Sequence, residues 1–203
     1  REMAPRRVLD WQLPANPIRY SQVHGTRALI VLDQQYFQIF DMLEGKPLSG
    51  RLGLGTEPET ATFTADGEGV LSAEAGGSIT RTDWRTGIRE VLFKIGVPAT
   101  FTSSSADGSK VVATGYEGAA YLWDSAASPP MRRLEGHEGN VLFAKFSPSG
   151  TWIVTTGTDQ SARLWNTATG RQKFAPLMHK SWVYSADFSP DEQSLVTCSY
   201  DGT

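Results

Sequence analysis

The chain has 203 residues but only one cysteine and three histidines. A single cysteine, Cys198, can form neither an intramolecular disulfide nor a multi-cysteine metal site, and we expect it to be a small core residue. The histidines, His24, His137 and His179, lie far apart and lack the spacing of common zinc ligands. We therefore expect no bound metal and no other cofactor.

Long apolar runs and a strong charge of one sign are also missing. No apolar run approaches the roughly 18–20 residues of a membrane-spanning helix, and no secretory signal is visible. The 19 Lys and Arg residues nearly balance 22 Asp and Glu residues, for a net charge of −3. This balance argues against a protein that coats nucleic acid. We expect a cytoplasmic chain that acts on neither nucleic acid nor membrane.

What the chain does contain is an internal repeat, marked by residues separated by 42, 41 and 42 positions: Phe40, Thr82, Trp123 and Trp165. A glycine lies 15 residues before each of them: Gly25, Gly67, Gly108 and Gly150. Three residues after each glycine comes an apolar pair: Ala28-Leu29, Val70-Leu71, Val111-Val112 and Ile153-Val154. Agreement of these markers over four periods indicates a repeat architecture.

Each repeat contains short β-branched or aromatic runs separated by Gly, Asp, Ser or Pro, which is typical of strands joined by tight turns. The clearest unit predicts strands near 141–147, 151–157, 160–166 and 171–177. No segment shows a sustained helical period, so the chain is predicted to be all-β. Four antiparallel strands in about 40–45 residues form the blade of a β-propeller.

Particular motifs add a family resemblance: Gly136-His137, Ser147-Pro148, Asp159, Leu164-Trp165-Asn166, Phe188-Ser189-Pro190 and Ser199-Tyr200-Asp201-Gly202-Thr203. They resemble WD40 repeats of the bacterial type, closely over 99–203 and weakly over 1–98. The resemblance implies about 4.6 blades of an incomplete WD40-like propeller ring with about seven blades in all. We expect an internal segment of a longer propeller, divided as follows: the end of a preceding blade with its connection at 1–16, blades at 17–56, 57–97, 98–136 and 137–178, and a truncated blade at 179–203.

The same resemblance implies a hydrogen-bonded tetrad that locks the strands and turns of a blade. The matching residues are His137, Thr155, Asp159 and Trp165, followed in the last repeat by His179, Thr197 and Asp201. A Thr, a His and an Asp could also suggest a nucleophilic triad, but Thr155 is expected to be buried with its partners saturated. The earlier repeats lack the set, so we expect their blades to depend on apolar packing.

In WD40 proteins one face of the propeller commonly holds partner peptides. The expected positions on that face flank the first apolar residue of the innermost strand or precede the turn aspartate. The candidates for partner binding are Trp182, Tyr184, Tyr200, Tyr116, Asn140 and Leu142, with Thr158 at the remaining position of its blade. Trp and Tyr are enriched at interface hot spots. Alternatively, these aromatics cap loops or pack against neighbouring blades.

The predicted function is a non-catalytic protein–protein interaction scaffold within a larger multidomain protein, which binds a protein or peptide on the propeller face. Any catalytic domain, such as a serine/threonine kinase, would lie outside this segment, because no kinase motif is present. The alternative is a propeller enzyme, a hydrolase or quinone-dependent oxidoreductase, that uses the central channel. That alternative requires converging acids or histidines, whereas the aligned inner strands offer mainly apolar residues: Val141, Ala144, Phe146, Val183, Ala186 and Phe188.

Overall fold

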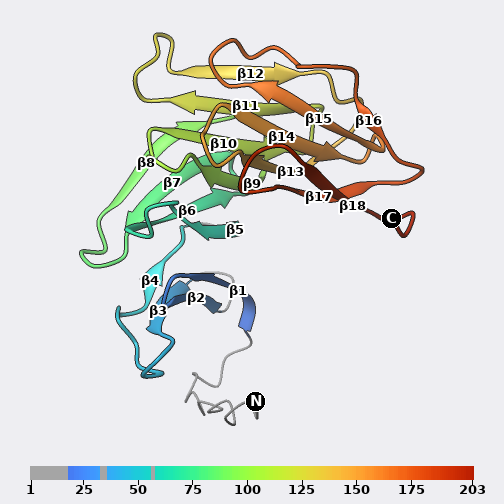
Figure 1. The fold of residues 1–203 in the computed structure, drawn as a ribbon. Helices are drawn as coiled ribbons and strands as arrows, with labels where there is room; N and C mark the ends of the chain where they lie inside the picture. Colours follow the sequence, from blue (N-terminus) through green and yellow to red (C-terminus); the bar gives the residue numbers. More distant parts are fainter. Residues whose placement is uncertain (1–17, 33–35, 56–57) are drawn as a thin grey trace, which may run out of the picture.

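The structure, a computed structural model, describes residues 18–32, 36–55 and 58–203. Within these ranges every helix or strand assigned is a β-strand, and the strands form antiparallel sheets that follow one another along the chain (Figure 1). This arrangement confirms the all-β, propeller-like fold predicted from the sequence. The end of a preceding blade expected at 1–16 lies outside the described residues. None of the described residues forms a helix that is long and apolar enough to cross a membrane.

Each sheet is a simple meander, in which consecutive strands pair. The first sheet comprises β1 (Ile18–His24), β2 (Arg27–Leu32), β3 (Tyr36–Asp41) and β4 (Leu52–Gly53). The second comprises β5 (Pro58–Phe63), β6 (Gly69–Glu74), β7 (Ser78–Asp83) and β8 (Arg89–Lys94). The third comprises β9 (Ala99–Ser104), β10 (Lys110–Gly115), β11 (Ala119–Asp124) and β12 (Met131–Glu135). The fourth comprises β13 (Val141–Phe146), β14 (Trp152–Gly157), β15 (Ser161–Asn166) and β16 (Leu177–Met178). The fifth comprises β17 (Val183–Phe188) and β18 (Leu195–Ser199).

The outermost strand of the fourth sheet is much shorter than the predicted strand at 171–177. Only β16 pairs with β15, and an isolated bridge joins Trp165 to Gln172. Between them, Pro176 has no N–H to give to a ladder, and the Gln172 side-chain amide donates to the Phe174 carbonyl. The prediction of a continuous strand was therefore wrong at this edge.

The apolar pair of each repeat is explained by burial on both faces of the second strand. Val111 packs in a cluster with Leu71 of the second sheet, whereas its neighbour Val112 packs with Ile153 of the fourth sheet. Successive side chains of a strand point to opposite faces, so two adjacent apolar residues serve two different interfaces. Consecutive sheets therefore stack through apolar cores, which positions their turns side by side.

The second strand of the fifth sheet departs from this pattern. Leu195 joins an apolar cluster with Val154 of the fourth sheet, but Val196 is 62% exposed. Cys198 is exposed as well. Because residues two apart along a strand share one face, Cys198 lies on the same side as Val196 and away from the fourth sheet. The expectation that Cys198 is a core residue was wrong.

Candidate partner-binding face

A β-bulge recurs at the same place in the first strand of each described sheet. Pairing with the second strand skips one residue, between Val141 and Phe143 in the fourth sheet and between Val183 and Ser185 in the fifth. The skipped residues of the five sheets are Arg19, Glu59, Thr100, Leu142 and Tyr184. A bulge bends its strand and redirects a side chain, and bulges are common beside functional sites. Nothing in the repeat spacing reveals this feature.

Three aromatic side chains gather at one end of the fifth sheet. Trp182, Tyr184 and Tyr200 are 49%, 41% and 74% exposed. The ring centroids of Trp182 and Tyr184 are 6.5 Å apart, and those of Tyr184 and Tyr200 are 5.1 Å apart. Their planes are tilted by 58° and 43°. The three candidate aromatics thus form one exposed cluster, which we call the aromatic cluster.

Backbone hydrogen bonds hold the two segments of the aromatic cluster together. The Tyr200 amide donates to the Trp182 carbonyl at 2.9 Å. One residue away on each segment, the Ser199 hydroxyl donates to the Ser181 carbonyl at 3.2 Å. These bonds fix the separation between the start of β17 and the turn after β18. The backbone positions of Trp182 and Tyr200 are consequently fixed relative to each other, and Tyr184 lies at the bulge of β17.

The last repeat also contains the hydrogen bonds expected of its tetrad residues. His179 Nδ1 lies 3.2 Å from Asp201 Oδ2, and its Nε2 lies 2.8 Å from Thr197 Oγ1. Asp201 also accepts from the Lys180 amide at 2.8 Å. Hydrogen bonds from the Thr203 hydroxyl and the Lys180 amide hold the pKa of Asp201 below its usual range. An ionised Asp201 therefore ties the turn that carries Tyr200 to the segment that leads into Trp182.

The remaining candidates occupy equivalent places on neighbouring sheets. In the fourth sheet the Thr158 amide donates to the Asn140 carbonyl at 2.9 Å, the same bond as between Tyr200 and Trp182. Leu142 is half-buried at the bulge position. Tyr116 is 54% exposed in the turn after β10 of the third sheet. Among the described residues, ring contacts do not connect Tyr116 with the aromatic cluster, so the aromatics concentrate on the fifth sheet.

In the fourth sheet all four tetrad residues are hydrogen-bonded. His137 Nδ1 lies 2.9 Å from Asp159 Oδ1, and His137 Nε2 lies 2.7 Å from Thr155 Oγ1. The Trp165 indole N–H donates to Thr155 Oγ1 at 2.8 Å. Thr155 is fully buried, and His137 and Trp165 are only 6% and 3% exposed. The chain of bonds joins four parts of the sheet: the irregular segment that leads into β13, the strands β14 and β15, and the turn between these two strands.

Protonation follows from this environment. Burial lowers the pKa of His137 and outweighs the opposing pull of Asp159, which favours a neutral imidazole. Burial works against the charged form of Asp159 too, but hydrogen bonds from His137, Ser161 and the Glu138 amide hold the pKa of Asp159 below its usual range. Nδ1–H then donates to Asp159, and Nε2 accepts from the Thr155 hydroxyl. The Thr155 hydroxyl already donates its proton to His137 and is buried from solvent, so it is poorly placed to attack a substrate.

The second and third sheets contain polar networks that sequence reasoning missed. In the second sheet, buried Glu74 accepts from the Thr80 hydroxyl at 2.5 Å and pairs with Arg89 from β8. In the third sheet, Glu117 accepts from the Tyr121 hydroxyl and, at 3.1 Å, from Arg133 of β12. Burial and the Glu117 carboxylate raise the pKa of Tyr121 to about 12.

These networks correct the expectation that the earlier blades depend on apolar packing alone. In each sheet from the second to the fourth, a carboxylate lies at or near the turn between the second and third strands: Glu74, Glu117 and Asp159. Its partner is an arginine from the fourth strand or a histidine that precedes the first strand. The available signal was a carboxylate near this turn together with an arginine in the last strand of the same repeat.

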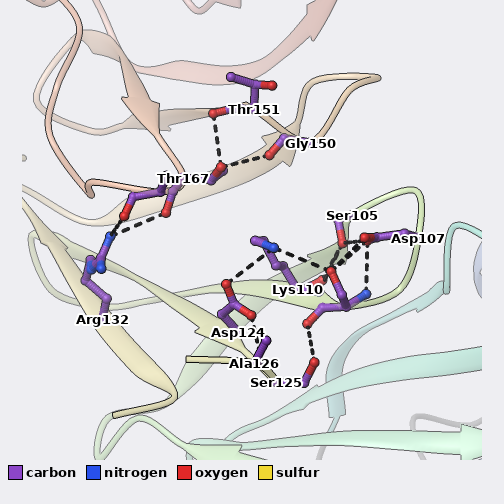
Figure 2. A network of polar contacts seen from close by, with 12 residues as sticks. Ser105, Asp107, Lys110, Asp124, Ser125, Ala126, Arg132, Gly150, Thr151 and Thr167 are labelled. Atoms are coloured by element: carbon purple, nitrogen blue, oxygen red, sulfur yellow. Dashed lines mark hydrogen bonds and ion pairs between the residues drawn. The ribbon is translucent and has the colours of Figure 1, made fainter. Parts of the chain in front are cut away.

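The opposite ends of the sheets are joined by other contacts, shown in Figure 2. Arg132 of the third sheet donates to the Ala168 carbonyl of the fourth sheet at 2.7 Å. Thr167, in the turn after β15, donates to the carbonyl of Gly150 in the turn between β13 and β14 at 2.9 Å (Figure 2). Within the third sheet, Asp107 accepts from the Ser105 hydroxyl at 2.6 Å. Hydrogen bonds from Ser105 and Ser109 lower the pKa of Asp107 to about 2.

A cavity of about 610 Å³ opens between the first strands of all five sheets, toward these opposite ends. Its lining includes Phe101 and Phe143, whose ring centroids are 4.7 Å apart. Lys145 and Asp187 also line it and pair with each other at 2.8 Å. The residues that the sequence analysis expected to face the central channel, such as Val141, mainly pack between sheets instead. The bulge explains the difference, because it changes which residues of the strand face the centre. Within the described residues, no group of three or more His, Cys, Asp or Glu could hold a metal ion.

Comparison with known families gives the class of the repeat. The family model "WD domain, G-beta repeat" matches residues 128–166 and 174–203. The matched segments contain the tetrad of the fourth sheet and the tetrad residues of the fifth. These two segments therefore contain WD40 repeats, which generally mediate protein interactions and are typically non-catalytic. No curated protein matches the chain significantly.

Proposed function

We propose that this chain is a non-catalytic interaction module, part of a larger multidomain protein, that binds a protein partner through the aromatic cluster. The proposal rests on one observation. Trp182, Tyr184 and Tyr200 lie together on two backbone segments joined by a hydrogen bond, and all three side chains remain substantially exposed. Large exposed aromatics in contact with one another are uncommon on a surface that binds nothing. Equivalent positions on the third and fourth sheets extend the binding face.

The physical chemistry of the aromatic cluster supports a role in binding. Trp and Tyr bring large apolar area and few rotatable bonds, so their burial at an interface gains hydrophobic energy at a small entropic cost. The bonds between the Tyr200 and Trp182 backbones preorganise the two segments before a partner arrives. Truncation of such anchors commonly costs about 2 kcal/mol or more of binding free energy.

The alternative roles fit the contacts less well. Aromatics that cap loops or cover a blade are expected to be buried, whereas Tyr200 is 74% exposed. A propeller enzyme would need an unpaired base or nucleophile in the central cavity. The charged pair there, Lys145 and Asp187, is internally neutralised at 2.8 Å. The interaction module is therefore the function that the geometry supports best.

To test the proposal, peptides that bind the full 203-residue chain are selected from a random peptide-display library. Their binding to variants of the chain is then measured. We expect enriched peptides to bind the wild type and to lose binding to the double variant Trp182→Ala/Tyr184→Ala. Phe174→Ala is the matched control, because Phe174 is 44% exposed but lies outside the face, beside the outer edge of the fourth sheet. Melting temperatures of all variants should stay close to that of the wild type.

Two results would contradict the proposal. Peptides that bind the double variant and the wild type equally would place the binding site elsewhere on the chain. A large fall in melting temperature in the double variant, accompanied by loss of β-sheet circular dichroism, would assign Trp182 and Tyr184 a structural role. Single variants, Trp182→Ala and Tyr184→Phe, then separate the contribution of each ring from that of the hydroxyl.

A further inference from the structure

Nine equivalent positions of the binding face, on three consecutive sheets, hold no formally charged residue. Each sheet contributes three equivalent positions: the residue before the first strand, the bulge residue and the residue before the turn acid. On the third, fourth and fifth sheets these residues are Pro98, Thr100, Tyr116, Asn140, Leu142, Thr158, Trp182, Tyr184 and Tyr200. All are exposed or half-buried, and none is ionisable at neutral pH, although 20% of the chain is charged. The partner surface that fits this strip is uncharged.

The acids that follow the strip in sequence do not supply a free charge either. Glu117 is paired with Arg133, Asp159 with His137, and Asp201 with His179. Their oxygens are also engaged by neighbouring hydroxyl or amide donors. A cationic partner would therefore find these three carboxylates already engaged.

The side chains of the strip offer both hydrogen-bond donors and acceptors to a partner backbone, and the Trp182 indole N–H only donates. An indole N–H can only donate, and a phenol hydroxyl and a side-chain amide can each donate to a carbonyl. Within the described part of the chain, neither the Trp182 indole N–H nor the hydroxyls of Tyr184 and Tyr200 engage another protein group. The donor-only indole of Trp182 requires an exposed carbonyl on the partner backbone, and the tyrosine hydroxyls can donate to further carbonyls.

We propose that this face binds an uncharged proline-rich segment of the partner in the polyproline II conformation. The inference rests on the proposed function and names the class of ligand. Polyproline II has no internal hydrogen bonds, and proline lacks an N–H, so such a segment presents mainly carbonyl acceptors. Its rise is about 3.1 Å per residue, so two residues span about 6 Å. This span is similar to the 6.5 Å and 5.1 Å between the rings of the aromatic cluster.

An amphipathic helix is a poorer match for the same surface. A helix satisfies its backbone groups internally and would present only apolar side chains to the strip. The Trp182 and Tyr184 donors would then be covered without acceptors, which is unfavourable for buried polar groups. Aromatic grooves that bind proline-rich ligands instead combine ring stacking with donors aimed at carbonyls.

The experiment uses the full chain labelled with 5-fluorotryptophan and follows the ¹⁹F resonance of Trp182, assigned through the variant Trp182→Phe. The probe is acetyl-octaproline-amide. We expect a saturable shift of the Trp182 resonance and no saturable shift of the other tryptophan resonances. Tyr184→Ala should weaken binding at least about tenfold, as for loss of a hot-spot aromatic. Tyr184→Phe should weaken it less, and Phe174→Ala should leave it unchanged.

Two comparison ligands test the class of partner. The uncharged helical peptide acetyl-(AAQAA)₃-amide and tetramethylammonium, a pure cation probe, should shift Trp182 more weakly than octaproline at equal concentration. Stronger binding of either one, or no saturable octaproline binding, overturns the proline-rich class. Octaproline binding that survives Tyr184→Ala also overturns it. If display-selected peptides without proline still require Trp182 and Tyr184, the interaction module stands and only the ligand class is wrong. If neither kind of peptide requires them, both proposals fail.

Discussion

Removal of the Thr155 hydroxyl tests whether the tetrad of the fourth sheet holds the fold. Thr155→Val keeps the shape of the side chain but deletes one hydroxyl that serves two partners. The hydroxyl accepts from the Trp165 indole at 2.8 Å and lies 2.7 Å from His137 Nε2, to which it donates. Both partners are more than nine-tenths buried, so water cannot replace the lost bonds without a local opening.

The expected loss of stability in Thr155→Val follows from the Trp165 indole N–H and the His137 imidazole nitrogen, which are left without partners. A buried donor or acceptor left without a partner costs about 1–3 kcal/mol. The indole N–H and the imidazole nitrogen together therefore predict a loss of roughly 2–6 kcal/mol of unfolding free energy. No cavity term is added, because valine and threonine have nearly the same shape.

The neighbouring residue provides the control. Thr156 is also fully buried on β14, but its hydroxyl has no hydrogen-bond partner in the described structure. Thr156→Val should therefore leave the unfolding free energy unchanged or increase it, since it removes an unsatisfied buried polar group. Urea unfolding at neutral pH, followed by far-ultraviolet circular dichroism, measures both variants. Equal losses in the two variants would refute the reasoning, because the hydrogen bonds would then contribute nothing beyond the chemistry of the substitution.

Three further predictions test other contacts. Arg89→Met leaves the buried Glu74 carboxylate without its cation and should lower the unfolding free energy by about 3–5 kcal/mol, with recovery in the double variant with Glu74→Met, as measured by urea unfolding. The folded-state pKa of His137 lies below its ordinary value of 6.5, so stability should be constant above about pH 6.5 and fall as the pH decreases below it. His137→Asn should flatten this slope in urea titrations between pH 7.5 and 5, and an unchanged slope would contradict the assignment. The pKa of Asp107 is lowered to about 2, so the stability it contributes should be present above its ordinary pKa and disappear as the pH falls toward 2; Asp107→Asn should then match the wild type in thermal melts at pH 2 but not at pH 7.

The parts of the fold that could be predicted from the sequence are those set by spacing. Trp165 and Trp123, together with the apolar pairs, repeat because a sheet between two neighbours buries both faces of its second strand, as Val111 and Val112 do. The hydrogen bonds of His137 could be predicted from the family resemblance, because each partner has a fixed place in the repeat. A pattern that recurs along the chain is read reliably when one physical requirement, burial on both faces, recurs with it.

Features that depend on a local exception could not be read in the same way. Glu74 and Arg89 form an ion pair that differs from the His137–Asp159 pair of the fourth sheet, and the resemblance to WD40 repeats names only the latter kind of pair. The bulges escape notice because they change the pairing partner without changing the spacing of apolar residues. For the same reason, the residues facing the central cavity, such as Lys145, were not identified from the alternation of the inner strands. The prediction of a continuous outer strand in the fourth sheet was wrong near Pro176, because proline has no backbone N–H to donate.

At each turn of the candidate binding face, an acid held by hydrogen bonds directly follows an exposed or half-buried residue. The acids Glu117, Asp159 and Asp201 are held by hydrogen bonds and ion pairs, and they fix the turn that contains them. The preceding residues are Tyr116, Thr158 and Tyr200, whose side chains remain exposed or half-buried. A substitution at the acid is expected to disturb the blade, whereas a substitution at Tyr116 or Tyr200 is expected to change mainly the exposed surface. This division lets a repeat keep its fold while the residues of its face vary, and it explains why the fourth and fifth sheets share their hydrogen bonds although only the fifth presents an aromatic cluster.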